Sequence, residues 1–326
     1  MAIAIKMHWV SSSIVALIFV IIGIAGNVLS LIIWSKKTMR SSTGTYLIFQ
    51  AIADVFVLLF FVLCDSLGQI HPVILGDKTY GEFFAYFGYP FFFLSVIVSI
   101  WMLVGVTVDR YLQVCWSHRS QEFCSQRRVY IGAGSIFLLC FIINIPHFKT
   151  FQPLDPPKEG RAFTFTEYGG GEGSKHYEFW VHCMFLVLAP WVAVFTFNIL
   201  ILRKVFESNK KTKLGKEKTR RAEAQLTRLL LTVTFTFLFL IIFQCLTQCV
   251  YMLKPESVNY RMVDEAFSIA KLGIVINSSI NFFLYCLSGR KFRKELKSLC
   301  FPQKSHLSLD RTSSLHSTSG TGSTTL

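Results

Sequence analysis

Long apolar stretches alternating with short polar segments dominate this chain. Seven stretches are mainly apolar over roughly 20 positions or more, the length that crosses the hydrocarbon of a bilayer. They cover approximately residues 14–34, 46–67, 84–114, 129–147, 177–202, 226–253 and 263–287. Because these stretches lack the regular charged face of a helix in a soluble protein, they predict seven membrane-spanning helices. The third and sixth are longer than a bilayer requires, which indicates tilt or extension beyond the headgroups.

The predicted fold class is therefore an all-α membrane protein, a seven-transmembrane helix bundle followed by a short amphipathic cytoplasmic helix. The composition agrees, because 52% of the 326 residues are hydrophobic and 16% are charged, whereas soluble proteins carry roughly 25% charge. We expect a short extracellular N-terminus (1–13), the bundle (14–287), the surface helix (289–300) and a disordered Ser/Thr-rich cytoplasmic tail (301–326). No segment resembles a cleavable signal peptide, so the first span is expected to act as its own insertion signal.

The distribution of positive charge predicts the orientation. The chain has 33 Lys and Arg residues and a formal net charge of +14, and most of these cations follow spans one, three, five and seven. Since Lys and Arg are retained on the cytoplasmic side, we expect a multi-pass plasma-membrane protein with its N-terminus outside and its C-terminus in the cytoplasm. The basic face is expected to contact anionic membrane lipids. Nucleic acid is not an expected partner, because the basic residues are confined to loops that flank the membrane.

A set of polar residues falls inside the predicted spans, where each is costly to bury and needs a partner. The set consists of Asn27, Asp54, Ser99, Asn277, Ser278 and Asn281. Asn277 and Asn281 are four residues apart and therefore share a helix face. If that face meets Asp54 and Ser99, their oxygens form a hydrated cation cage. Alternatively, each polar residue makes an isolated hydrogen bond between packed helices, and the spacing alone leaves both interpretations open.

The cysteines and potential catalytic residues give no sign of an enzyme. The nine cysteines form no Cys-rich extracellular framework, so little dependence on disulfides is expected. Cys245 and Cys249 are one helical turn apart, but no further ligand completes a metal site, and we interpret them as packing residues. No metal triad, His-rich cluster or Ser/His/Asp set lies at membrane depth, so no catalysis is predicted.

Several motifs resemble those of rhodopsin-like (class A) G-protein-coupled receptors, and together they cover about residues 10–300. They are Gly26-Asn27, Ala51-Ile52-Ala53-Asp54, Asp109-Arg110-Tyr111, Pro190 and Asn281-Phe282-Phe283-Leu284-Tyr285. The segment 36–43, together with the following Tyr46-Leu47 and 51–54, is most similar to invertebrate FMRFamide-type neuropeptide receptors. The resemblance implies signal transduction from an extracellular ligand to a heterotrimeric G protein.

The resemblance also implies a sodium site. In the family an Asp, a Ser and two Asn bind an allosteric sodium ion, and here Asp54, Ser99, Asn277 and Asn281 match them. This match favours the cation cage over isolated hydrogen bonds. No other cofactor and no other metal are expected.

A second implied site is the cytoplasmic switch. In the family, the Arg of the Asp-Arg-Tyr motif is held by its neighbouring acid in the inactive state and faces the G protein on activation. These roles match Arg110 and Asp109, with Tyr111 completing the motif, and the family's tyrosine toggle of the seventh helix matches Tyr285.

The chain departs from the family in several places. Phe282 replaces the usual proline of the seventh helix, so a weaker kink is expected. Ala85 occupies the position of the outer cysteine of span three, and the loop 149–176 has no cysteine either, so both partners of the family's disulfide are missing. The Gly-rich stretch 169–173 is therefore interpreted as a loosely tethered, flexible linker.

The outer mouth of the bundle indicates the ligand class. Phe92 stands where aminergic receptors carry an anchoring Asp, and Val275 stands where opsins carry the retinal Lys, so biogenic amines and light are not expected. Phe239 and Phe243 are the expected substitutes for the toggle Trp of span six. The candidate pocket residues are Asp65, Phe92, Phe243 and Glu265, with Asp65 first because it faces inward if the family register holds. Acids among aromatic rings suit an Arg-containing, C-terminally amidated peptide, although each acid taken singly also fits an ordinary solvated loop charge.

The C-terminal tail contains candidate sites for modification and for binding further proteins. Phosphorylation of its Ser and Thr residues would add negative charge for an arrestin-type partner. Cys300 is a palmitoylation candidate or a plain buried thiol, and Thr324 and Leu326 fit a C-terminal ligand of a PDZ protein.

The alternatives to a neuropeptide receptor are a chemosensory receptor for small molecules and a membrane transporter. A transporter would need inverted repeats or a chain of intramembrane charges, and the sequence has neither.

Overall fold

The helical spans form the framework of the molecule. The computed structural model describes residues 10–211 and 260–300, together with single residues between 232 and 249. Six helices in this part of the chain are long and apolar enough to cross a membrane: Ser13–Ser35, Ser42–Ile70, Lys78–Cys115, Gln126–Lys149, Glu172–Glu207 and Glu265–Leu287. They coincide with predicted spans one to five and seven. The predicted sixth span, 226–253, lies outside the described residues except for those single positions.

Five of these spans are built from consecutive helical segments, whereas the span Glu265–Leu287 lies within one continuous helix, α13. The long helices are α2 (Ala16–Ser35), α3 (Ser42–Phe61), α6 (Tyr89–Cys115), α8 (Gln126–Asn144), α11 (Ala189–Lys211), α13 (Tyr260–Ser288) and α14 (Arg290–Cys300). Wider π-helical turns precede or extend four of them: η1 (Val10–Val15), η3 (Val62–Ser66), η5 (Phe84–Gly88) and η7 (Val181–Leu188). Short helical pieces lie in the connections: η2 (Lys37–Met39), α4 (Leu67–Ile70), η4 (Pro72–Gly76), α5 (Lys78–Phe83), α7 (Ser120–Phe123), η6 (Ile145–Lys149), α9 (Glu167–Gly170) and α10 (Glu172–Trp180).

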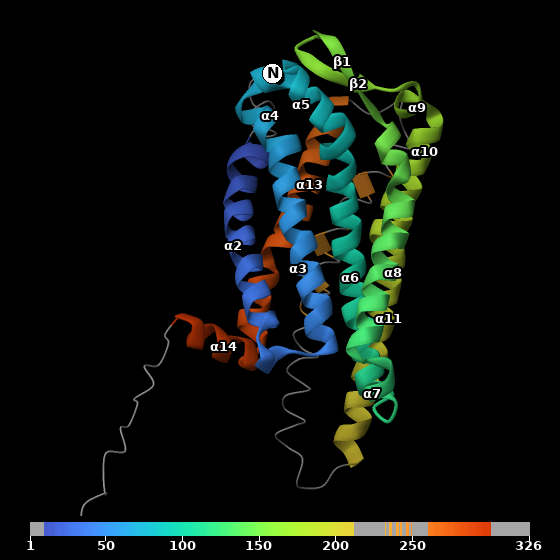
Figure 1. The fold of residues 1–326 in the computed structure, drawn as a ribbon. Coiled ribbons are helices and arrows are strands. Elements are labelled where there is room, and N and C mark those ends of the chain that lie inside the picture. Colours follow the sequence, from blue (N-terminus) through green and yellow to red (C-terminus); the bar gives the residue numbers. More distant parts are fainter. Residues whose placement is uncertain are drawn as a thin grey trace, which may run out of the picture.

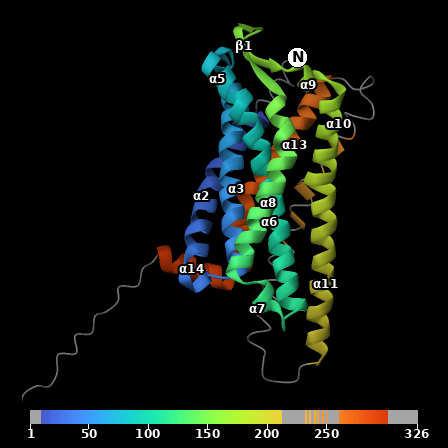
Figure 2. The same cartoon turned by 45° about the vertical axis from the view of Figure 1, so that its right-hand side comes forward.

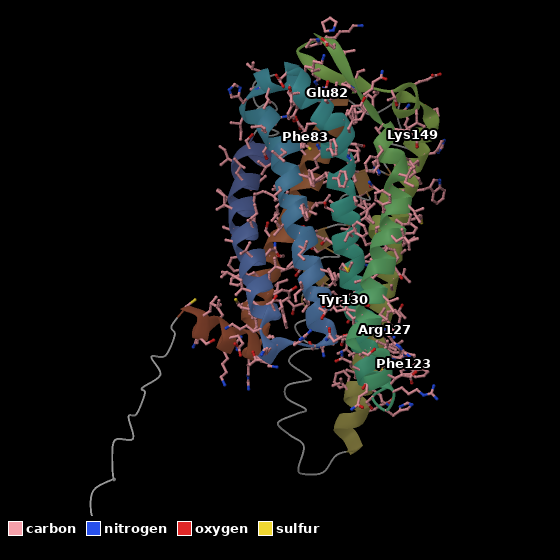
Figure 3. The ribbon with its side chains drawn as sticks, in the orientation of Figure 1. Glu82, Phe83, Phe123, Arg127, Tyr130 and Lys149 are labelled. Atoms are coloured by element: carbon pink, nitrogen blue, oxygen red, sulfur yellow. The ribbon has the colours of Figure 1, made fainter. Side chains whose placement is uncertain are left out.

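Helix α6 lies at the centre of the described bundle, between α3 and α8 (Figure 1). In its span, 78% of the most apolar stretch is buried, whereas the corresponding share for the span of α8 is 22%. The exposed residues of α8 are nevertheless large and apolar, among them Tyr130, Phe137, Leu138 and Ile142. Tyr130 lies near Arg127 towards one end of the helix (Figure 3), and its ring meets that of Phe49 of α3 edge to face at 6.0 Å. An apolar outer surface around a buried central helix is the arrangement expected for a bundle surrounded by lipid.

The connection between spans four and five is a β-hairpin, so the expectation of an all-α fold is wrong in this loop. We call the end of the bundle that carries this hairpin the outer end, and the opposite end the inner end. Strand β1 (Phe151–Lys158) pairs antiparallel with β2 (Arg161–Phe165), and Phe151 lies opposite Phe165. The turn uses left-handed backbone at Glu159 (φ 50°) and Gly160 (φ 73°), which glycine adopts without a steric cost. The loop pairs its own backbone groups in this way.

An aromatic cluster joins this hairpin to the outer end of span three. We call Tyr80, Phe84, Phe151 and Phe163 the aromatic clasp. The Phe84 and Phe163 rings stack with centroids 4.1 Å apart, and the Phe84 and Phe151 rings meet edge to face at 5.2 Å. Phe84 directly precedes Ala85, the position where the family places its cysteine. Aromatic packing therefore holds the hairpin at the place where a disulfide was expected to be missing.

Backbone contacts beside the clasp bring the hairpin close to the helix. A side chain at Gly81 would clash with the carbonyl group of Ala162, a residue with no exposed surface. Farther along the loop, a side chain at Gly169 would clash with the Thr150 carbonyl, and the Thr166 hydroxyl accepts a hydrogen bond from the Gly169 amide at 2.9 Å. The first half of the Gly-rich stretch 169–173 is thus closely packed, and its interpretation as a flexible linker is wrong there.

Helix α14 packs across the inner end of the bundle (Figure 1). It occupies the segment in which the sequence predicted an amphipathic surface helix. Its Phe292 is 1% exposed and contacts the rings of Trp34 and Tyr285, each at 5.6 Å. The ammonium of Lys36 lies 3.1 Å from the Glu295 carboxylate. One apolar residue and one ion pair therefore fix this helix against spans one and seven.

Candidate functional site

Asp54 is the centre of a buried polar cluster, which we call the Asp54 cage. Its side chain has no exposed surface. The Ser99 hydroxyl of α6 donates to Asp54 Oδ1 at 2.6 Å, and Asn281 Nδ2 of α13 donates to Asp54 Oδ2 at 2.9 Å. The Ser278 side chain lies beside the same carboxylate and interacts with it. Three helices distant in sequence are therefore joined at one buried carboxylate.

The membership of the cage differs by one position from the sequence prediction. Asn277 is half-buried, and the described residues include no hydrogen bond between it and Asp54. Its neighbour Ser278 supplies the contact instead. Asn27 of α2 braces the same turn of α13, because its amide donates to the Ser278 backbone carbonyl at 2.8 Å. All the predicted polar residues except Asn277 thus take part in one connected arrangement.

A second polar cluster lies at the inner end of α6, and we call it the inner gate. The Asp109 carboxylate is 4% exposed. Its Oδ2 accepts hydrogen bonds from Ser42 Oγ at 3.0 Å, Thr43 Oγ1 at 2.5 Å and Gln113 Nε2 at 2.8 Å. Arg110 Nη1 donates to Gln113 Oε1 at 2.8 Å. Gln113 therefore connects the acid, the guanidinium and the start of α3.

This geometry corrects one detail that the resemblance implied. Among the described ion pairs there is none between Asp109 and Arg110. Instead, the amide of Gln113 lies between them and bonds to each. Sequence reasoning missed Gln113, although its position four residues after Asp109 places both on one helix face.

The remaining switch residues pack against rings. Tyr111 lies 5.1 Å from Phe197 of α11, measured between ring centroids, and its hydroxyl accepts a hydrogen bond from Trp116 Nε1 at 3.2 Å. Tyr285 is 2% exposed and meets the Trp34 ring edge to face at 5.8 Å. These contacts place Tyr111 between spans three and five and Tyr285 between spans one and seven.

A cysteine beside the inner gate is held neutral. The Cys124 thiol donates to the Asp109 backbone carbonyl at 3.8 Å. Burial, followed by the nearby Asp109 carboxylate, raises the pKa of the Cys124 thiol to about 12. Since the thiolate is the reactive form, this thiol is inert at neutral pH.

At the opposite end, Asp65 faces the interior of the bundle. The Lys271 ammonium of α13 lies 2.7 Å from Asp65 Oδ1, and the Asp65 side chain is 13% exposed whereas that of Lys271 is 39% exposed. This contact joins the outer ends of spans two and seven. The inward orientation expected for Asp65 is therefore present, and Lys271 is its partner, which sequence reasoning missed.

The other pocket candidates differ in their surroundings. Phe92 is 7% exposed and packs against Phe61 and Phe93, so it belongs to the core at this depth. Glu265 is half-buried near the outer end of α13. Phe243 lies outside the described residues. Phe239, its expected partner, is 79% exposed, so the prediction that it replaces an inward toggle residue is wrong.

A comparison with known protein families tests the prediction that the chain is a membrane-spanning receptor. The model of a family described as "7 transmembrane receptor (rhodopsin family)" matches residues 26–285. The chain belongs to this family. The membrane-spanning receptor predicted from the motifs is thereby confirmed.

Receptors of known name are similar over most of this chain. The FMRFamide receptor of Drosophila melanogaster is 28% identical over 94% of this chain, and the chain spans 56% of that receptor's length. The sex peptide receptor of Drosophila melanogaster is 25% identical over 86% of the chain and 70% of its own length. Human galanin receptor type 1 is 27% identical over 92% of the chain and 85% of its own length. The FMRFamide-type resemblance expected from the sequence agrees with these comparisons.

Among the described residues, no group of three or more His, Cys, Asp or Glu side chains is arranged to hold a metal ion. The Asp54 cage is of a different kind, because it combines one carboxylate with hydroxyl and amide groups. Cys300, the palmitoylation candidate, is exposed at the end of α14, whereas Thr324 and Leu326 lie outside the described residues.

Proposed function

We propose that this receptor transmits binding of an extracellular, C-terminally amidated neuropeptide to heterotrimeric G proteins. Membership of the rhodopsin family and similarity to an FMRFamide receptor, a sex peptide receptor and galanin receptor type 1 support a peptide ligand. In this proposal the protein lies in the plasma membrane with the hairpin outside and α14 in the cytoplasm. It is a signal transducer and catalyses no reaction.

The ion pair of Asp65 with Lys271 is the observation that supports an arginine-containing peptide as the ligand. A carboxylate that is 13% exposed at the mouth of the bundle provides an anchor for one cation. A peptide guanidinium offers this carboxylate two parallel hydrogen bonds, whereas the lysine ammonium is a point charge. An arginine of the ligand can therefore replace Lys271 at Asp65, and the outer end of α13 then loses this contact with span two.

A movement of α13 at the outer end would be transmitted to the cytoplasmic end through the buried polar residues. Asn281 of α13 donates to Asp54 and Ser278 lies beside the same carboxylate, so a shift of α13 changes the Asp54 cage. An agonist that binds the shifted arrangement more tightly increases its population. At the inner gate, Arg110 then exchanges Gln113 for a G-protein helix that enters the cleft.

A screen with synthetic peptides tests the ligand and the anchor. Cells that express the receptor and a G-protein activation reporter are treated with amidated peptides ending in Arg-Phe, and with the same peptides carrying citrulline in place of arginine. We expect Asp65→Asn to raise the half-maximal concentration of the arginine peptides at least about tenfold, since a charge-assisted hydrogen bond contributes roughly 1.5–3 kcal/mol. The citrulline peptides should be equally weak on both receptors.

Two controls make this screen decisive. Glu82 is an exposed acid at the same end of the molecule (Figure 3), so Glu82→Gln should leave the potency unchanged. Arg110→Ala should abolish G-protein activation while peptide binding remains. Silence of the receptor towards every such peptide, or equal losses with Asp65→Asn and Glu82→Gln, would contradict the proposal.

The proposal includes an allosteric sodium ion at the Asp54 cage. A carboxylate, two hydroxyls and an amide carbonyl supply the hard oxygen ligands that suit a hard cation, so Asp54, Ser99, Ser278 and Asn281 fit the ion. Asn277 remains a predicted fifth ligand. Sodium would supply positive charge beside a carboxylate that has no exposed surface and would favour the arrangement in which α3, α6 and α13 are close together.

The predicted partners of the C-terminal region also belong to this proposal. The exposed Cys300 follows a helix with five basic residues: Arg290, Lys291, Arg293, Lys294 and Lys297. Basic charge and an acyl chain together anchor a segment to an anionic membrane surface. Arrestin at the phosphorylated tail, and a PDZ protein at Thr324 and Leu326, complete the expected set of partners.

A further inference from the structure

Two cysteines from different spans have their sulfur atoms in contact. The Sγ atoms of Cys183 and Cys249 lie 3.6 Å apart. Cys183 belongs to η7 in span five and is 2% exposed, whereas Cys249 is half-buried in the predicted sixth span. Neither is part of a disulfide. In the sequence, Cys249 pairs only with its helical neighbour Cys245, because its approach to Cys183 depends on the packing of two helices.

We propose that Cys183 and Cys249 are a redox-sensitive pair that forms a disulfide between spans five and six. Sulfur atoms in a disulfide are about 2.05 Å apart, so the two thiols must approach each other by about 1.5 Å. Small rotations about the side-chain torsions supply a movement of this size, because the two sulfurs already face each other. The proposal concerns a modification site distinct from the Asp54 cage, the inner gate and Asp65.

Other described cysteines do not form such a pair. Cys115 donates to the Leu200 carbonyl and Cys124 donates to the Asp109 carbonyl, each at 3.8 Å. Among the described cysteines, Cys183 and Cys249 are the one pair whose sulfurs lie within 4.0 Å of each other. Among the described cysteines, oxidation should therefore give this one cross-link.

A hydroperoxide supplies the oxidising equivalents. The Cys249 thiolate, the more accessible of the two, attacks a peroxide oxygen; the oxygen–oxygen bond breaks, and with hydrogen peroxide one water leaves and Cys249 becomes a sulfenic acid. The Cys183 sulfur then attacks the Cys249 sulfur, a sulfur–sulfur bond forms and a second water leaves. Two thiols and one hydrogen peroxide thus give one disulfide and two waters, and the two electrons lost by the sulfurs reduce the peroxide.

The cross-link would join spans five and six, whose relative movement is required for signalling. This consequence rests on the proposed function. Trp101 Nε1 of α6 donates to the Phe185 carbonyl at 3.1 Å, so η7 is already bonded to the central helix. Segment η7 follows α10 at the hairpin end of the molecule (Figure 2). A disulfide to Cys249 would attach span six to this fixed outer segment. Oxidation should then restrict the movement of span six that receptor activation requires.

Peptide mapping tests the cross-link without reference to any ligand. The full-length receptor in lipid nanodiscs is treated with hydrogen peroxide, the remaining thiols are blocked with N-ethylmaleimide, and the protein is digested without reduction. Mass spectrometry should detect a Cys183–Cys249 cross-linked peptide that disappears after reduction with a phosphine. It should be lost in both Cys183→Ala and Cys249→Ser, and it should remain in Cys140→Ser, which removes a buried thiol of α8. Blocked thiols at both positions, or Cys249 joined to another cysteine, would overturn the proposal.

A signalling assay tests the consequence separately. In cells carrying the G-protein reporter, peroxide should lower the maximal response to an activating Arg-Phe-amide peptide, and a cell-permeable phosphine should restore it. Cys183→Ala, once its surface expression is matched to the unmodified receptor, should retain the full response in peroxide. If the cross-link forms and the response is unchanged, the regulatory role is refuted while the modification site stands. If no peptide activates the receptor, the proposed function fails, and peptide mapping alone decides the disulfide.

Discussion

The aromatic clasp and the polar inner half hold the same central span by different means. At the outer end, Phe84 is fixed by stacking on Phe163 at 4.1 Å. In the inner half, the Asp54 cage and the inner gate fix the helix through hydrogen bonds to two buried carboxylates, Asp54 and Asp109. Stacking depends on area and tolerates sliding, whereas a hydrogen bond is lost after a displacement of about 1 Å.

This difference suits the outer end to ligand recognition and the inner half to a change between signalling states. A hydrogen-bonded network has discrete arrangements, because each donor must find a new acceptor when it leaves the old one. The inner half can therefore change between defined states. The clasp at the outer end consists of ring contacts, supplemented by ion pairs such as that of Lys78 with Asp155 at 2.7 Å. It can therefore adjust to ligands of different shape with few polar bonds to exchange, and the absence of the family's disulfide at Ala85 removes a covalent restraint on that adjustment.

The largest effect is expected from breaking the clasp. Phe84→Ala removes a ring that is 9% exposed and contacts the hairpin, so the receptor should lose about 3–5 kcal/mol of stability, as is usual for a buried Phe. Thermal unfolding of the purified receptor in detergent measures this loss. Phe87→Ala is the matched control, because Phe87 belongs to the same segment η5 but is 57% exposed. Equal losses from both variants would mean that the hairpin is held by other contacts.

An intermediate effect is expected from sodium at the Asp54 cage. When sodium chloride replaces choline chloride, a ligand at ten times its Kd stabilises the folded receptor by about 1.4 kcal/mol. The thermal midpoint of the unmodified receptor should therefore rise in sodium, and that of Asp54→Asn should not. The comparison between salts separates ion binding from any direct effect of the substitution on folding. The Phe84→Ala variant should retain its sodium response if the two regions are independent, and retained sodium dependence in Asp54→Asn would refute the cage.

The sequence predicted best those features that depend on long or periodic patterns. The membrane spans follow from apolar runs longer than 20 residues, and α14 follows from basic residues alternating with Phe292 and Leu296. Asp54, Ser99 and Asn281 were identified from motif positions, and they do meet. These features are fixed by local patterns, so they could be recognised without knowledge of the packing.

The features that were missed depend on helix rotation and on contacts between distant segments. The choice between Asn277 and Ser278 is a rotation of α13 by about 100°, which no spacing rule settles. Lys271 reaches Asp65 from a position 206 residues away. The hairpin had a signal that could have been used, because Phe163 and Phe165 alternate with small or polar residues and follow a Gly, a pattern typical of a strand after a turn.

The smallest effect is expected from acid at the inner end, where α14 is held by a partly exposed ion pair. A hydrogen bond from the Thr38 hydroxyl, and then the Lys36 ammonium, lower the pKa of the Glu295 carboxyl. A group with a lowered pKa contributes stability above its usual pKa and loses it as the pH falls through the folded value. Amide hydrogen exchange in α14, corrected for the intrinsic effect of pH, should therefore stay slow at neutral pH and become faster in acid. Glu295→Gln should remove this pH dependence, and Glu122→Gln, an exposed acid that is 61% exposed and pairs with Arg128, should preserve it. If exchange in α14 does not depend on pH in the unmodified receptor, the docking of α14 depends on Phe292 and not on the ion pair, and the inner end is then held by rings as the outer end is. If the pH dependence persists in Glu295→Gln, a group other than Glu295 is responsible for it.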